Sequence, residues 1–178
     1  MQVMDYDCKL EKLCETYFIQ HCLASFPYHM YEFKMADVEV DSIVPLCRYV
    51  FNERLTFARQ LVELYETSSI ALFEPCIRYD SFGRKSIIAP PVIEQRDGVN
   101  ILCDGMHRVY SVIRDDLKNI KVLLVKNHTL PLPGELNSWE NVCLMPEQLP
   151  VETNFINFKR EGLTGYSKFF NDECFLNL

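Results

Sequence analysis

Apolar and polar positions recur with two alternating periods in the first third of the chain. Between residues 10 and 22 apolar residues return every three or four positions, which predicts an amphipathic helix ending before Pro27. Residues 31–41 alternate apolar and charged side chains, as half-buried strands do, and this strand region ends near Pro45. The helical period returns after Asn52, which could cap a second helix. The apolar face of that helix consists of Leu55, Ala58, Leu61, Val62 and Tyr65.

The middle of the chain has the clearest pattern. Two apolar runs, 91–94 and 99–103, flank Arg96-Asp97-Gly98, and Asp-Gly between such runs predicts an antiparallel hairpin. A helix is expected over 106–117, followed by a buried strand over 121–125. The predicted order is therefore strand, glycine turn, helix and strand.

These elements predict an α+β fold: a small mixed sheet with packed helices in a single domain. Residues 1–30 form an N-terminal helical extension, 31–128 the core, and 129–178 a C-terminal extension packed on the core. Residues 67–86 mix a short apolar run with turn residues and have no clean period, so we interpret them as an insertion.

Composition narrows the range of functions. The apolar fraction of 48% is typical of a globular protein, and the net charge of −7 gives a field that repels nucleic acid. Nucleic acid is therefore an unlikely partner. No apolar run approaches the roughly 18 residues of a membrane span, and the N-terminus lacks the pattern of a signal peptide, so a cytoplasmic location is expected.

Eight cysteines occur without any CxxC or CxxH pair, which makes a zinc site unlikely. In a reducing compartment such residues act mainly as small buried apolar groups. Cys14 and Cys22 fall on the apolar face of the first predicted helix, and Cys103 falls within a predicted strand. All three are expected to be structural.

The segment Asp104-Gly105-Met106-His107-Arg108 carries the candidate chemistry. A glycine before a helix permits close approach of a ligand, and the first helix amides, here of Met106, His107 and Arg108, favour an anion. The planar fork of Arg108 could bind two phosphate oxygens, while Asp104 would face a metal or a substrate hydroxyl. The structural alternatives are a salt-bridged Arg108 and a His107 that is satisfied within the core.

The stretch PPVIEQRDGVNILCDGMHRVYSVIRDDLKNIKVLLVKN resembles the core of the ParB/sulfiredoxin-like superfamily, and a weaker resemblance extends back to about residue 36. Sulfiredoxins have a catalytic cysteine where this chain has Met106. ParB partition proteins carry a Gly-Glu-Arg-Arg turn, bind CTP, and continue into a basic helical domain that this chain lacks. Free serine kinases of this fold have an Asp-Gly-His-His-Arg turn and a catalytic glutamate at a helix start, where Glu53 lies. The kinase type fits best.

This resemblance implies a protein that binds ATP or ADP with Mg²⁺ and transfers a phosphoryl group to a small hydroxyl-bearing molecule, or hydrolyses the nucleotide. Glu53, Asp104 and His107 would be catalytic, with Glu53 and Asp104 also holding Mg²⁺, and residues 105–108 would bind the nucleotide. Lys85, Lys126 and His128 are further cationic candidates.

Two other functions remain open from the sequence. The first is a nucleotide-sensing switch without catalysis, whose terminal extensions bind a protein partner or a second copy. The second is a DNA-associated partition or nuclease-type protein, which the acidic charge disfavours.

Overall fold

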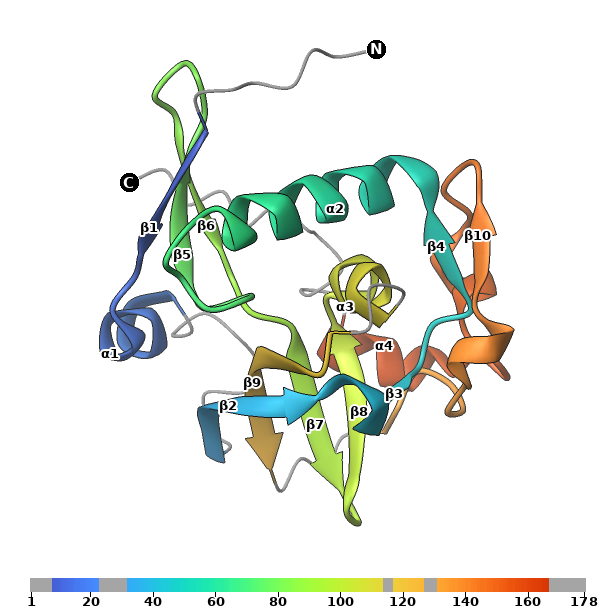
Figure 1. Cartoon of the computed structure of the whole chain (residues 1–178). Helices are drawn as coiled ribbons and strands as arrows, with labels where there is room; N and C mark the ends of the chain where they lie inside the picture. Colours follow the sequence, from blue (N-terminus) through green and yellow to red (C-terminus); the bar gives the residue numbers. More distant parts are fainter. Residues whose placement is uncertain (1–7, 23–31, 114–116, 127–130, 167–178) are drawn as a thin grey trace.

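The computed structural model describes residues 8–22, 32–113, 117–126 and 131–166 (Figure 1). Its two longest helices, α2 (Asn52–Glu66) and α3 (Met106–Ile113), pack against each other beside the largest sheet. The expected α+β class is therefore confirmed. None of the helices in the described part of the chain is long and apolar enough to cross a membrane. Tyr31, His128 and the expected helical residues 114–116 lie outside the described residues.

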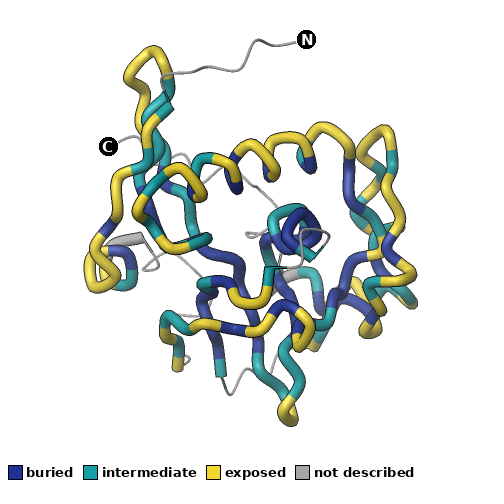
Figure 2. The backbone as a smooth tube through the Cα atoms, viewed as in Figure 1, coloured by how far each residue is buried: buried dark blue, intermediate teal, exposed yellow. Residues whose placement is uncertain are grey.

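The largest sheet has the strand order β2-β9-β7-β8-β3 and mixes parallel and antiparallel pairs. β7 runs antiparallel to β8 and parallel to β9, while β3 runs parallel to β8. The central strands are buried, as the dark blue segments of Figure 2 show. The five strands are β2 (Glu32–Glu39), β3 (Ile43–Pro45), β7 (Val92–Arg96), β8 (Val99–Asp104) and β9 (Asn119–Lys126). A single 3-10 turn, η3 (Val40–Ser42), joins β2 to β3.

The predicted hairpin is confirmed as β7 and β8. Asp97 and Gly98 at its turn both have positive φ, of 49° and 81°, which is the geometry that favours Asp-Gly. At the other end of the hairpin Val92 pairs with Asp104 but Ile93 pairs with Leu102. One residue of β8 is therefore extra. This β-bulge bends the strand immediately before the Asp104-Gly105 turn.

Helix α2 buries all five residues of the predicted apolar face. The prediction that Asn52 caps this helix is wrong, because Asn52 is the first helical residue and Phe51 is the N-cap. The carbonyl of Asn52 accepts a hydrogen bond from Thr56 Oγ1 at 2.9 Å. Since Phe51 has no polar side chain, the first amides of α2 must find other partners.

A small antiparallel sheet, which we call the arm, stands away from the main sheet in Figure 1. Its order is β1-β5-β6, with β1 (Lys9–Lys12), β5 (Cys76–Tyr79) and β6 (Lys85–Ile88). The helical prediction is thus wrong where β1 forms, because β1 pairs with a distant hairpin and this pairing outweighs the local helical periodicity. Residues 67–86, which we interpreted as an insertion without a clean period, contain regular structure, since β5 and β6 pair there. Within residues 8–22, helical structure is limited to α1 (Glu15–Tyr17) and a π-helical turn, η1 (Phe18–Cys22).

The C-terminal part packs on β3 and the short strand β4 (Tyr49–Phe51). Strand β10 (Cys143–Met145) pairs in parallel with β4, and Trp139 Nε1 donates to the Ile43 carbonyl at 2.6 Å. Its other elements are the 3-10 turns η4 (Trp139–Asn141) and η5 (Val151–Asn154) and the helix α4 (Arg160–Tyr166).

The cysteines differ in their environments. Cys103 is buried within β8, as predicted, and Cys47 and Cys76 are buried too. The expected burial of Cys14 is wrong, because the residues before it pair as β1 and leave Cys14 exposed at the start of α1. The side chain of Cys22 is outside the described part of the structure.

Candidate functional site

Helix α3 starts on Gly105, whose carbonyl accepts the first helical hydrogen bond from the Val109 amide at 2.9 Å. Gly105 has a φ of +87°, and a Cβ placed on it would lie 2.9 Å from Cβ of Pro91. The glycine is therefore required by the packing of the turn on Pro91 and by its backbone conformation. The amides of Met106, His107 and Arg108 follow, and by helix geometry they have no intrahelical acceptor.

Arg108 and Asp104 are held together at this turn. Arg108 Nη2 lies 3.3 Å from Asp104 Oδ2, and Nη1 donates to the carbonyl oxygen of Ala89. The two side chains are only 14% and 18% exposed. The expected orientation of Arg108, with its fork open toward two phosphate oxygens, is thus not what the structure has. The salt-bridged alternative is observed, and an anion here would share the guanidinium with protein acceptors.

His107 joins the start of α3 to the start of α2. The backbone N–H of Phe51 donates to His107 Nε2 at 3.0 Å, and the two rings lie 5.6 Å apart. Because Nε2 is an acceptor, a neutral imidazole here carries its proton on Nδ1. The two helix starts, residues 51–53 and 105–108, therefore form one local unit, which we call the junction. Sequence reasoning missed Phe51 because its contribution is a backbone group.

Glu53 is the second residue of α2 and is exposed. A carboxylate in the first turn is stabilised by the partial positive charge of the helix N-terminus. The same charge, contributed by both helices, favours an anion at the junction. Glu53 thus lies in the half of the junction that solvent reaches.

Met106 and Cys103 lie on the apolar side of the turn. The side chain of Met106 belongs to the hydrophobic core, so only its backbone amide is available to a ligand. Cys103 Sγ donates to the Ile101 carbonyl at 3.5 Å. Met106 has no thiol, and the Cys103 thiol is turned to the Ile101 carbonyl, so no thiol of these two residues lies at the junction as the catalytic cysteine of a sulfiredoxin would.

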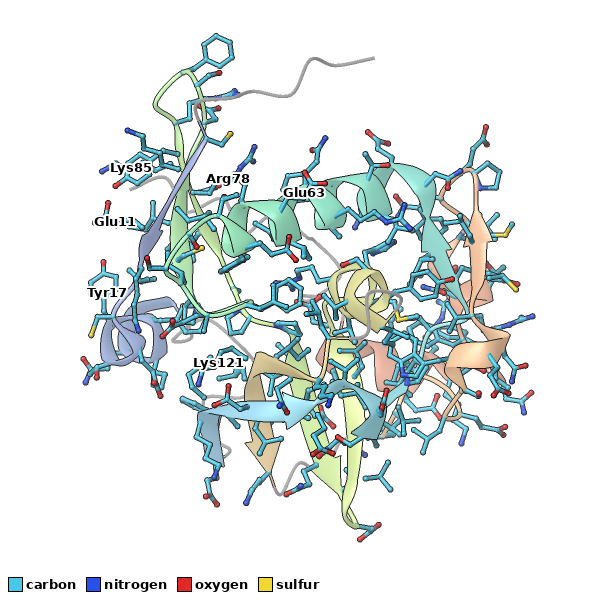
Figure 3. All side chains as sticks on the ribbon, in the orientation of Figure 1. Glu11, Tyr17, Glu63, Arg78, Lys85 and Lys121 are labelled. Carbon is cyan, nitrogen blue, oxygen red and sulfur yellow. The ribbon has the colours of Figure 1, made fainter. Side chains whose placement is uncertain are left out.

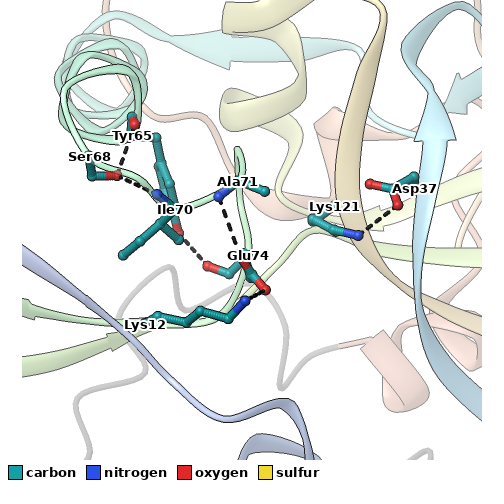
Figure 4. Close-up of polar contacts among 8 residues, drawn as sticks. All are labelled: Lys12, Asp37, Tyr65, Ser68, Ile70, Ala71, Glu74 and Lys121. Carbon is teal, nitrogen blue, oxygen red and sulfur yellow. Dashed lines mark hydrogen bonds and ion pairs between the residues drawn. The ribbon is translucent and has the colours of Figure 1, made fainter.

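A buried pair that the sequence did not reveal lies within electrostatic reach of Arg108. Tyr65 OH donates to the Glu74 carbonyl at 2.7 Å (Figure 4). The same hydroxyl lies 3.1 Å from Cys76 Sγ. Burial raises the pKa of the Cys76 thiol to about 11 and raises that of Tyr65 well above its ordinary value. The positive charge of Arg108 acts in the opposite direction on both groups.

The expected Mg²⁺ site has few protein ligands available to it. Within the ranges that the structure describes, no three His, Cys, Asp or Glu residues gather closely enough to hold a metal ion. Mg²⁺ that arrives with a nucleotide needs only one or two protein carboxylates, because phosphate oxygens and water complete its octahedron. Glu53 and Asp104 suit that role as oxygen donors. Lys85 belongs to the arm and Lys126 ends β9, so neither is part of the junction.

A mixed sheet whose bulged strand leads through a glycine turn into a helix defines a domain of the ParB/sulfiredoxin-like type. The family model described as the ParB CE domain matches residues 11–134, well over half of the 178 residues. The chain belongs to this family. The matched segment includes the second half of β1, the rest of the arm and the whole junction. No curated protein and no solved structure gives a significant match.

Proposed function

We propose that the junction binds the phosphate groups of ATP or ADP. The observation that carries this proposal is the hydrogen bond from the Phe51 amide to His107, because it fixes two helix starts beside one another. Each helix N-terminus favours an anion by about 0.3–1 kcal/mol, and its first amides can donate to phosphate oxygens. Two such ends at one place suit a polyphosphate better than one does.

We further propose a phosphoryl transfer of the free serine kinase type. Glu53 takes the proton of a small hydroxyl-bearing acceptor, whose oxygen forms a bond to the terminal phosphorus while the bond to the bridging oxygen breaks and ADP leaves. The Asp104–Arg108 pair positions the acceptor and the phosphates, and His107 keeps α2, and with it Glu53, in place. Mg²⁺, held by Asp104, would neutralise phosphate charge, so that Glu53 stays available as the base.

A nucleotide-sensing switch without catalysis is the second candidate. Its support is that Arg108 contacts Ala89, the residue that directly follows β6. An anion that bound to the Arg108 guanidinium would therefore alter a contact at the base of the arm. A DNA-associated role is also compatible with membership of the ParB CE family, but the net charge of −7 disfavours it.

The replacement Glu53→Gln separates the first two candidates. It preserves shape and removes the charge, so turnover of MgATP in a mixture of small hydroxylated metabolites should fall by about 10²–10⁴, measured by mass spectrometry of the phosphorylated product. Affinity for MgATP, measured by calorimetry, should change little, because the helix amides carry it. Glu63→Gln, on an exposed position of the same helix, is the matched control and should leave both quantities unchanged.

Two results would decide against parts of the proposal. Binding of MgATP without any turnover in the parent protein would exclude the phosphotransferase and leave the switch. Absence of measurable binding of MgATP and MgADP would exclude both.

A further inference from the structure

The arm has a charge and a shape unlike those of the rest of the protein. It carries the basic residues Lys9, Lys12, Arg78, Arg84 and Lys85 against only Glu11 and Asp80, although the whole chain has a net charge of −7. In Figure 1 it projects past the end of α2, and Figure 3 labels Arg78, Lys85 and Glu11 on it. Part of this charge is used internally, since Lys12 is ion-paired with Glu74 at 2.6 Å (Figure 4). Arg84 is likewise ion-paired with Asp80, so the excess positive charge of the arm comes from Lys9, Arg78 and Lys85.

An aromatic side chain stands at this tip. Phe82 is 81% exposed, which is unusual for a large apolar residue, and the Arg84 guanidinium lies 5.4 Å from its ring centroid. On the adjoining strand, Lys85 lies 5.5 Å from the Tyr79 ring centroid. Aromatic and arginine side chains together are the residues that most often dominate binding at protein interfaces.

The tip is held in one shape by its own hydrogen bonds. Asp80 accepts from the amides of Phe82 and Arg84 at 2.9 and 2.8 Å and pairs with the Arg84 side chain at 2.5 Å. Gly83 supplies the positive φ of 74° that the turn requires. At the neighbouring strand, Tyr79 OH donates to Glu11 at 2.7 Å. A preorganised tip loses little conformational entropy when it binds.

The opposite end of the molecule is complementary. Residues 131–158 contain four glutamates, Glu135, Glu140, Glu147 and Glu152, and no lysine or arginine. Within this segment Leu144 on β10 is 49% exposed. Two basic residues adjoin this segment. The carbonyl of Arg48 accepts from the Cys143 amide while its guanidinium lies over the Tyr49 ring, and the amide of Lys159 donates to the Pro133 carbonyl. We call residues 135–152 the acidic end, and Figure 1 shows β10 and the arm at opposite sides of the protein.

We propose that the arm of one copy docks on the acidic end of a second copy. Phe82 packs against Leu144 of the next copy, and Arg84 and Lys85 face Glu140 and Glu147 there. The two surfaces are different and lie at opposite ends of one chain, so the contact is heterologous and produces closed rings or open chains of copies instead of a two-fold dimer. The surface is small, which predicts a weak association, with a dissociation constant on the order of micromolar, that salt opposes.

Two charge-altered variants and their mixture test this arrangement. The arm variant is Phe82→Ala with Lys85→Gln, and the end variant is Glu140→Gln with Glu147→Gln; all four positions are exposed. In sedimentation velocity the parent protein should show concentration-dependent association that weakens between 0.1 M and 1 M salt, where the Debye length falls from about 10 Å to about 3 Å. Each variant alone should associate at least about tenfold more weakly.

The mixture is the decisive measurement. Each variant retains the surface that the other lacks, so equal amounts should form a 1:1 complex and nothing larger, whereas a two-fold contact would give no such rescue. Arg59→Gln and Glu63→Gln, on exposed positions of α2, change the charge by one unit per site in the same way and should associate like the parent.

Other outcomes would overturn the proposal. A parent protein that stays monomeric at all concentrations, or variants that associate undiminished, would exclude the contact. Loss of binding to a labelled single-stranded oligonucleotide in the arm variant, with the parent monomeric, would assign the arm to nucleic acid instead. Circular dichroism of each variant would show whether it is folded. If the arm variant does not fold, Phe82→Ala alone replaces it in the mixture.

Discussion

The starts of α3 and α2 meet at the junction but are built in opposite ways. At α3, Gly105 is buried against Pro91 and Arg108 is held by Ala89 and Asp104, so protein groups occupy the turn. At α2, by contrast, the first residues are exposed, and the only bond between the two starts that we identify in the described residues is that from Phe51 to His107. The motif that stands out in the sequence thus forms the frame of the site, and the less distinctive start of α2 forms its accessible side.

This difference predicts that substitutions on the two sides will have different consequences. Changes at Gly105 and Arg108, which form the frame, should lower the free energy of unfolding, whereas changes at Glu53 and at His107, which ties the two helix starts together, should act mainly on ligands. Four predictions follow in order of decreasing effect on stability.

Gly105→Ala should have the largest effect. The new Cβ would meet Pro91 at 2.9 Å in a backbone conformation that side chains rarely adopt, so we expect a loss of about 3 kcal/mol or more in urea unfolding followed by circular dichroism. Gly98→Ala is the matched control, because Gly98 has a φ of +81° but no atom within 4 Å of the new Cβ. It should lose only about 1 kcal/mol. Equal losses would mean that packing on Pro91 contributes nothing.

Arg108→Ala should be next. It leaves the largely buried Asp104 without its guanidinium partner and the Ala89 carbonyl without a donor, at a cost of about 2–3 kcal/mol in the same assay. Arg108→Lys should recover only part of the loss, because an ammonium cannot reach both acceptors as a planar fork does. Arg59→Ala, on an exposed position of α2, should change stability by less than about 0.5 kcal/mol. A loss of similar size in Arg59→Ala would contradict the conclusion that the contacts of Arg108 stabilise the turn.

Stability should also fall at alkaline pH through Cys76. Its folded pKa of about 11 is above the ordinary thiol value of 9.0, so the unfolded chain loses this proton first. The contribution is complete below pH 9 and is lost as the pH rises toward 11, with about 2 kcal/mol lost by pH 10.5. Urea unfolding at pH 8 and pH 10.5 would measure it. Cys76→Ala should show a shallower decline, although Tyr65, whose pKa is also raised, still contributes above pH 10.

His107→Ala should have the smallest effect on stability, about 1 kcal/mol, because it removes one hydrogen bond from the Phe51 amide. Its effect on MgATP affinity should be larger, about tenfold, since the two helix starts are no longer tied. His107→Gln offers a side-chain carbonyl as acceptor and should restore much of both. Unchanged affinity in His107→Ala would remove the junction as the binding site.

Local patterns predicted the parts of the fold that depend on neighbouring residues. The apolar face of α2 and the Asp97-Gly98 turn are examples, because helical period and turn chemistry act over a few positions. The arm was missed because β1 pairs with β5 more than sixty residues away, and no local signal records such a pairing. At the site, a salt-bridged Arg108 was one of the alternatives expected, but its partner, Asp104, was assigned to a metal or a substrate hydroxyl instead.

The remaining partners at the site could not be found from the sequence. The Ala89 carbonyl and the Phe51 amide are backbone groups, which every residue type offers equally. Residue identity therefore says nothing about them. Only the path of the chain brings them to Arg108 and His107.

Because Arg108 contacts Ala89 directly after β6, a small rotation of the arm at this contact would become a large displacement at its tip. Ala89 directly follows β6, so Arg108 holds the pivot, while Phe82 lies seven positions earlier, on the order of 20 Å away at about 3.3 Å per strand residue. A rotation of about 10° at the pivot would move the tip by about 3–4 Å, and a load on the tip would act on the Arg108 contact with the same mechanical advantage. The contact between Arg108 and Ala89 therefore lies at the point about which the tip would turn.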